Sequence, residues 1–107
     1  MPITVASRLP VEIAPAGTGS VSLSALASAA TSAQLLAANQ RRKGLILVNT
    51  DANAVYVKYG TTASATSFTV IIPGNGGYWE MPAPIYTGQI DAIWAADGSG
   101  SLYATEL

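Results

Sequence analysis

The stretch QRRKGLILVNTDANAVYVKYG, residues 40–60, decides the fold. Three consecutive positive charges, Arg41, Arg42 and Lys43, lead into the apolar run of residues 45–48. Four consecutive branched aliphatic residues predict a strand that is buried on both faces. The residues TDAN then form a tight turn, because Asp and Asn side chains bond back to their own backbone. Residues 54–60 alternate between apolar and polar side chains, which predicts a second strand.

Further short strands are predicted on both sides of this stretch, separated by turn sequences. The segment PGNGG, residues 73–77, is predicted to be a turn. It is not a phosphate-binding loop, because it does not lie between a strand and a helix. The turn DGSG, residues 97–100, predicts a hairpin. The predicted strands are SAQLLAA (32–38), KGLILVN (43–49), AVYVKYG (54–60), FTVII (68–72), YWEMP (78–82), GQIDAIWAA (88–96) and SLYATEL (101–107).

About seven short strands with this spacing predict an all-β protein, an antiparallel β-sandwich with an N-terminal extended arm. A jelly roll, an immunoglobulin-like sandwich and a small barrel all remain open at this level. In the late strand, Ile90, Ala92 and Trp94 share one face, so we expect Trp94 in the core.

Residues 1–31 differ in composition from residues 32–107, and we interpret them as a Ser/Ala-rich arm before a β-sandwich domain. An extended arm would become ordered on a neighbouring subunit, because Ser and Ala bury little apolar surface. A helix over residues 22–43 is the alternative, with Gly44 after its end. The larger apolar residues of the arm are spaced like a strand added to a partner's sheet edge, and they are interface candidates: Ile3, Val5, Leu9, Val11 and Ile13.

The composition excludes several classes of function. The 107 residues contain no cysteine and no histidine, which removes disulfides, thiolate nucleophiles, imidazole bases and common zinc ligands. Only 10% of the residues are charged and the net charge is -1, so nothing draws the protein to nucleic acid or to an anionic membrane. The longest apolar run is far below the ~20 residues of a membrane span. We expect no cofactor, no metal, no nucleic-acid partner and no membrane partner.

A catalytic site is not predicted. Glu80, Asp91 and Asp97 are the carboxylates that acid–base chemistry would need, but they are isolated and lie in no catalytic motif. Asp51 and Asp97 lie in turn sequences, where Asp stabilises the turn itself. We therefore expect a protein that is not an enzyme.

The basic triplet has two interpretations. A nucleic-acid site needs a wider patch of positive charge with aromatic residues between the charges, and only Arg8 and Lys58 add to Arg41, Arg42 and Lys43. We favour a solvated rim at the start of a buried strand, with ion pairs to a neighbouring subunit. The three residues are interface candidates.

Four aromatic residues, Tyr78, Trp79, Tyr86 and Trp94, concentrate in the C-terminal half beside prolines. Aromatic rings on a β-sandwich can bind sugars, but they also dominate cores and protein interfaces. We favour the core or interface for them, with Tyr78, Trp79 and Tyr86 as interface candidates. Carbohydrate is the lesser alternative.

The segments NQRRKGLILVNTDANAVYVKYG and FTVIIPGNGGYWEMPAPIYTGQIDAIWAADGSGSLYATE together resemble a small β-sandwich structural protein of tailed bacteriophages, of the head decoration, cement or fibre-associated type. The resemblance covers roughly residues 32–107 and leaves residues 1–31 outside. It implies a β-sandwich that binds the major capsid protein or other virion proteins, and it carries over no catalytic residue. The expected protein is a homo-oligomer, a dimer or a trimer, that is assembled in the host cytoplasm and located in the virion.

Overall fold

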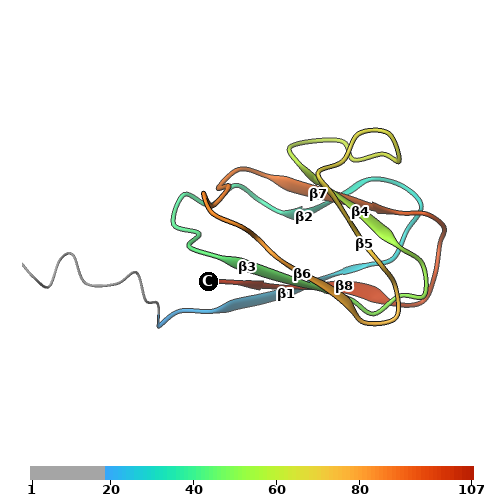
Figure 1. The fold of residues 1–107 in the computed structure, drawn as a ribbon, viewed down its shortest axis with the longest axis horizontal. Helices are drawn as coiled ribbons and strands as arrows, with labels where there is room; N and C mark the ends of the chain where they lie inside the picture. The colour runs from blue at the N-terminus through green and yellow to red at the C-terminus, as the bar shows by residue number, and fades with distance from the viewer. Residues whose placement is uncertain (1–18) are drawn as a thin grey trace, which may run out of the picture.

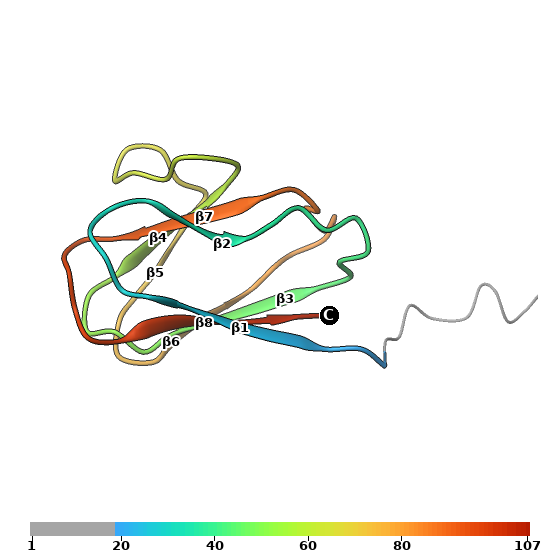
Figure 2. The same ribbon diagram turned by 180° about the vertical axis from the view of Figure 1, so that it is seen from behind.

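The computed structural model describes residues 19–107 as two β-sheets that face each other, seen as an upper and a lower layer in Figure 1 and from behind in Figure 2. All regular structure in this part of the chain is β-strand. The eight strands are β1 (Ser22–Ala27), β2 (Ala33–Leu36), β3 (Leu45–Asn49), β4 (Val55–Tyr59), β5 (Val70–Ile72), β6 (Gly77–Glu80), β7 (Ile90–Trp94) and β8 (Ser101–Glu106).

The strand order identifies the architecture. The first sheet has the order β1-β8-β3-β6 and the second sheet the order β2-β7-β4-β5, with every neighbouring pair antiparallel. Only β4 and β5 are joined within one sheet, and each of the other connections crosses from one sheet to the other. This is the order of an eight-stranded jelly roll. The predicted antiparallel β-sandwich is therefore confirmed. Of the three architectures that the sequence left open, the jelly roll matches the strand order.

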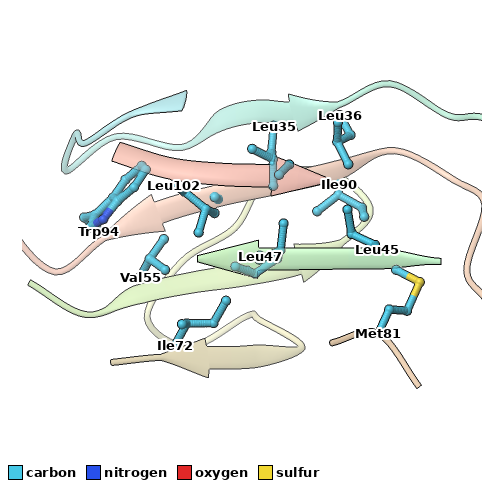
Figure 3. Close-up of a cluster of buried hydrophobic side chains, with 13 residues drawn as sticks. Leu35, Leu36, Leu45, Leu47, Val55, Ile72, Met81, Ile90, Trp94 and Leu102 are labelled. Atoms are coloured by element: carbon cyan, nitrogen blue, oxygen red, sulfur yellow. The ribbon is translucent and has the colours of Figure 1, made fainter. Parts of the chain in front are cut away.

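The core lies between the two sheets and follows the alternation of side chains along each strand. From the second sheet, Val55, Val57 and Ile90 point inward, and from the first sheet Leu47 and Leu102 meet them. Figure 3 shows Trp94 at one end of this cluster and Met81 at the other. Trp94 is only 2% exposed, which confirms its prediction as a core residue.

Strand β3 differs from its prediction in one respect. Leu45 and Leu47 are buried, but Ile46 and Val48 are only half-buried, because the outer face of the first sheet has no second layer over it among the described residues. The apolar run therefore supplies a core face and, on the other side of the strand, a partly exposed apolar face.

The hairpin predicted at DGSG is wrong, because β7 and β8 belong to different sheets. Residues 97–100 instead form an arch that carries the chain from one sheet to the other. The physical reason is the buried carboxylate of Asp51, which accepts a hydrogen bond from the Gly100 N–H at 2.8 Å. A Cβ at Gly98 or Gly100 would collide with Asp51, so the glycines allow this close approach.

The N-terminal region also differs from its prediction. Residues 1–18, with the interface candidates Ile3, Val5, Leu9, Val11 and Ile13, lie outside the described residues. Within the expected arm, however, Ser22–Ala27 form strand β1, which pairs with β8 along its whole length. The helix alternative is wrong for this segment. Leu23 and Ala25 are exposed on one face of the strand and Leu26 packs against the core from the other face, and the Ser side chains do not favour a helix. The sandwich thus begins before residue 32.

Candidate functional site

At one end of the sandwich, Arg42 joins three segments of the chain. It lies in the β2–β3 connection and its side chain is fully buried. Its Nε donates to Glu106 of β8 at 2.7 Å, and its Nη1 donates to the carbonyls of Tyr86 and Gly88 at 2.8 and 3.1 Å. Its Nη2 donates to the Ala37 carbonyl at 3.0 Å. The planar guanidinium therefore closes this end of the sandwich with a fork of bonds that a lysine could not reproduce.

The basic triplet was predicted to be a solvated rim. This prediction is wrong for Arg42, which is buried, and it fits only the exposed Arg41 and Lys43. Arg41 and Lys43, on either side of Arg42 in the sequence, are exposed. The ion pair of Arg42 is made with Glu106 of the same chain. The pattern RRK could not reveal this, because the sequence does not show which of three adjacent basic residues points inward.

Arg41 and Lys43 instead line an open depression of about 320 Å³ at the same end of the sandwich. Its other lining residues are Asn39 in the β2–β3 connection, residues 20–22 at and just before the start of β1, and residues 106–107 at and just after the end of β8. The lining includes Ser20, which follows the first described residue, so these two interface candidates lie close to where the described chain begins.

At the opposite end, Asp51 holds the inter-sheet arches together. Its Oδ2 accepts the backbone and side-chain N–H groups of Asn53 at 2.9 and 3.0 Å, and its Oδ1 accepts the Gly100 N–H. The backbone hydrogen bonds from Asn53 and Gly100 hold the pKa of the Asp51 carboxyl below its usual value of 3.8. The backbone carbonyl of Asp51 also accepts the Asn75 N–H at 2.7 Å, which fixes the PGNGG turn.

Asn49, the last residue of β3, connects this end cluster to the core. Its Oδ1 accepts from the Trp94 Nε1 at 3.2 Å and from the Asp51 N–H at 3.1 Å. Its Nδ2 donates to the carbonyls of Asn53 and Pro73 at 2.9 and 3.2 Å. Both amide atoms of a buried side chain are thus satisfied, and they tie β3 to β7. Asn49 was not predicted from the sequence, although a polar residue at the end of an apolar strand was the available signal.

The carboxylates considered for catalysis do not come together. Glu80 is exposed at the end of β6 in the first sheet, while Asp91 lies in β7 of the second sheet and accepts from the Gln89 Nε2 at 2.9 Å. Asp97 accepts the Ala30 N–H at 2.7 Å in an arch. Among residues 19–107 no group of three or more His, Cys, Asp and Glu side chains is placed to hold a metal ion.

The aromatic interface candidates are divided between two environments. Tyr86 stacks on Tyr59 with ring centroids 4.4 Å apart, and Trp79 lies against the same Tyr59 at 6.2 Å, all three packed against the core. This burial raises the pKa of the Tyr59 hydroxyl. Tyr78 points the other way and is 73% exposed. The three candidates therefore do not form one sugar-binding surface.

Tyr78 lies on the outer face of the first sheet, together with other exposed apolar side chains. The strand register places Ala25, Tyr103, Val48 and Tyr78 side by side across β1, β8, β3 and β6. Tyr103 is 50% exposed, and Leu23 of the neighbouring row is 74% exposed. We call this surface the outer face of the first sheet. Tyr103 and Leu23 were missed from the sequence, although the alternation of SLYATEL places Tyr103 opposite to the core residues Leu102 and Ala104.

Comparisons with family models, with curated proteins and with solved structures gave no match for this chain. Within the described part of the chain, no helix has the length and apolar character needed to cross a membrane.

Proposed function

We propose that the protein is a non-enzymatic structural component of a tailed-phage virion, and that it is a capsid decoration or cement protein that stabilises the shell through protein–protein contacts. The observation that carries this proposal is the outer face of the first sheet. This face exposes Leu23, Tyr78 and Tyr103 around Val48. In the rows of paired residues that cross these strands, Glu80 is the charged residue. An exposed apolar surface with tyrosines and few charges is typical of a protein interaction site.

The internal polar groups support the same proposal. Arg42, Asn49 and Asp51 each make several hydrogen bonds within their own chain, mostly to backbone groups and otherwise to the side chains of Glu106, Trp94 and Asn53. Their chemistry maintains the two ends of the sandwich and leaves no activated nucleophile or base among them. We expect no turnover of polysaccharide or ester substrates, measured with the purified protein, and turnover that is lost in Glu80→Gln or Asp91→Asn would contradict this.

The fold agrees with the resemblance of residues 32–107 to tailed-phage structural proteins. Eight-stranded jelly rolls occur in viral capsid domains and also in lectins. Because one fold serves several functions, the strand order supports a virion role only by analogy. The surface and the sequence resemblance together favour the capsid role over the others.

The first experiment is a mass-spectrometric inventory of purified particles of the phage whose genome encodes the chain. We expect the protein in many copies per particle, released together with the shell. Recovery of the protein with the tail or the fibres would instead favour a head-fibre or tail component of the same fold. Absence from the particles would contradict a virion role.

The second experiment tests the surface itself by co-sedimentation of the purified protein with particles that lack it. The double variant Tyr78→Ser/Tyr103→Ser should lose binding, because it removes both exposed rings from the outer face of the first sheet. The matched control Phe68→Ser/Ile71→Ser removes two exposed apolar side chains at β5 of the second sheet and should bind like the unchanged protein. Equal loss in both variants would contradict the assignment of the surface.

A carbohydrate-binding adhesin module is the second candidate, and one observation favours it. Tyr78 and Tyr103 lie on either side of Val48, so two strand spacings of about 4.8 Å separate their strands on a flat, exposed face. Two rings in this position can stack on sugars of one extended chain. Binding of the protein to polysaccharide, lost in Tyr78→Ser/Tyr103→Ser and kept in the control, would favour this candidate over the decoration protein.

A further inference from the structure

The four edge strands of the sandwich differ in how they are protected against pairing with another chain. Strand β2 has four residues and a bulge between Gln34 and Leu36. Strand β5 has three residues and is followed by Pro73, and β6 has four residues, ends at the charged Glu80 and is followed shortly by Pro82. Short length, bulges, charges and prolines are the usual devices that block edge-to-edge pairing.

Strand β1 has none of these devices. Its six residues, SLSALA, include no charge and no proline, and they pair with β8 without a bulge. Five of the six are exposed. Among residues 19–107, β8 is the only strand that pairs with β1, so its other side is an open edge.

The hydrogen-bond register shows which backbone groups face that open edge. The Ser28 N–H donates to the Gly100 carbonyl at 3.0 Å, which continues the ladder between β1 and β8. Because bonding alternates along an antiparallel strand, Leu26, Ser24 and Ser22 also direct their N–H and C=O groups to β8. The groups of Leu23, Ala25 and Ala27 therefore point away from β8, to the open edge.

We propose that β1 pairs antiparallel with β1 of a second copy of this chain, with Ala25 opposite Ala25 of the second copy. This register is self-complementary, as a two-fold axis requires. It places Leu23 opposite Ala27 of the second copy and Ala27 opposite Leu23 of the second copy. Three residues on each strand then exchange about six backbone hydrogen bonds, and every edge-facing group of the two strands is paired.

The side chains fit this arrangement. Ala25 and Ala27 are small and leave the backbone accessible, and Leu23 gains an apolar neighbour on the outer face, where it is otherwise exposed. The net charge of -1 causes little repulsion between copies. Pairing also makes one continuous eight-stranded sheet, in which the outer faces of the two first sheets lie side by side.

The inference deepens the proposed function, because it says how copies of the proposed decoration protein associate and how they double the surface that contacts the shell. Its test uses purified protein without particles, so that its failure and the failure of the virion role are separate results. The chain contains no cysteine, which makes single-cysteine variants of the full chain clean probes of register.

The first variant is Ala25→Cys. In the proposed register the two introduced thiols lie on directly opposed residues, whose Cα atoms are about 5.5 Å apart, within the range that a disulfide spans. The matched control is Leu23→Cys. In the proposed register, residue 23 of one copy is four residues along the strand from residue 23 of the second copy, so these two positions are about 14 Å apart. Under mild oxidation we expect Ala25→Cys to become a covalent dimer, with twice the monomer mass of 10.9 kDa. Leu23→Cys should stay monomeric on a denaturing gel, and Leu23→Cys/Ala27→Cys should cross-link.

A second measurement does not depend on thiols. Sedimentation analysis of the unchanged full chain should give the mass of a dimer, and Ala25→Pro should give the mass of a monomer with its thermal unfolding transition retained. Proline there removes only an N–H that faces the open edge, which edge strands tolerate. Equal cross-linking of Ala25→Cys and Leu23→Cys would overturn the proposal. It would also be overturned if Ala25→Cys cross-links only after residues 1–18 are removed, because the chain's own N-terminal segment would then occupy the edge.

Discussion

Arg42 shows how one side chain can hold an entire end of a sandwich. It is the one basic residue of its triplet that lies inside, and it binds groups from the β2–β3 connection, the β6–β7 connection and β8. Its burial is tolerable because every bond goes to a carbonyl or to the carboxylate of Glu106. Removing the guanidinium would leave these acceptors without a donor and the carboxylate without its counter-charge.

We therefore expect Arg42→Ala to lower the free energy of unfolding by about 3–5 kcal/mol, the usual cost of breaking a buried ion pair from one side. The measurement is a urea titration followed by tryptophan fluorescence. Arg41→Ala is the matched control, because Arg41 is exposed, and a surface change of this kind stays within about 0.5 kcal/mol. Equal effects of the two variants would contradict the role of Arg42.

Asp51 makes stability depend on pH. Its pKa is lowered in the folded protein by the hydrogen bonds from Asn53 and Gly100, so the ionised form favours the folded state. This stabilisation is fully present above the unfolded-state value near 3.8 and is lost as the pH falls through the lower, folded-state value. We expect the free energy of unfolding to fall as the pH is lowered below about 4.

The variant Asp51→Asn should be less stable at neutral pH and should lose part of this acid-induced decrease. Denaturant titrations at neutral and acidic pH measure both effects. Glu80→Gln removes one exposed carboxylate with the same change in formal charge, and it should keep the decrease seen in the unchanged protein. If Asp51→Asn showed the full decrease, another group would be responsible.

At the scale of the element, β7 is the strand that the sequence described best. Its alternation placed Ile90, Ala92 and Trp94 on one face, and all three are buried. Trp94→Ala should cost roughly 3–5 kcal/mol, since it removes a large core side chain and leaves a cavity. Tyr78→Ala is the control with an exposed ring and should change stability little. Denaturant titration distinguishes them, and a loss below about 1 kcal/mol for Trp94→Ala would contradict its place in the core.

Strand β1 changes what a truncation should do. Deletion of residues 1–18 leaves all described strands intact, so the sandwich should keep its thermal unfolding temperature. Deletion of residues 1–31 also removes β1 together with Leu26, which packs against the core, and it exposes the backbone of β8. We expect this longer deletion to aggregate or to unfold at a lower temperature, measured by circular dichroism. Equal stability of the two truncated proteins would show that β1 contributes nothing to the fold.

At the scale of the whole molecule, the sequence predicted the strands and the sandwich because alternation and turn residues are local signals. It did not predict which sheet each strand joins, since that depends on contacts between distant residues such as Asp51 and Gly100. The hairpin expected at DGSG failed for this reason. The outer face was only partly foreseen, because Tyr78 was singled out from composition, whereas Leu23 and Tyr103 join it through the register of β1 with β8 and of β8 with β3.

The crossing connections have a consequence for engineering. Among the described strands, the β4–β5 loop, residues 60–69, is the link that stays within one sheet, so added length there does not alter a connection between the two layers. Ala65 and Thr66 are exposed at its tip, which Figure 1 shows standing clear of the upper layer. A foreign epitope inserted between them would be carried outward on every copy of the protein, so this loop is a suitable position for peptide display.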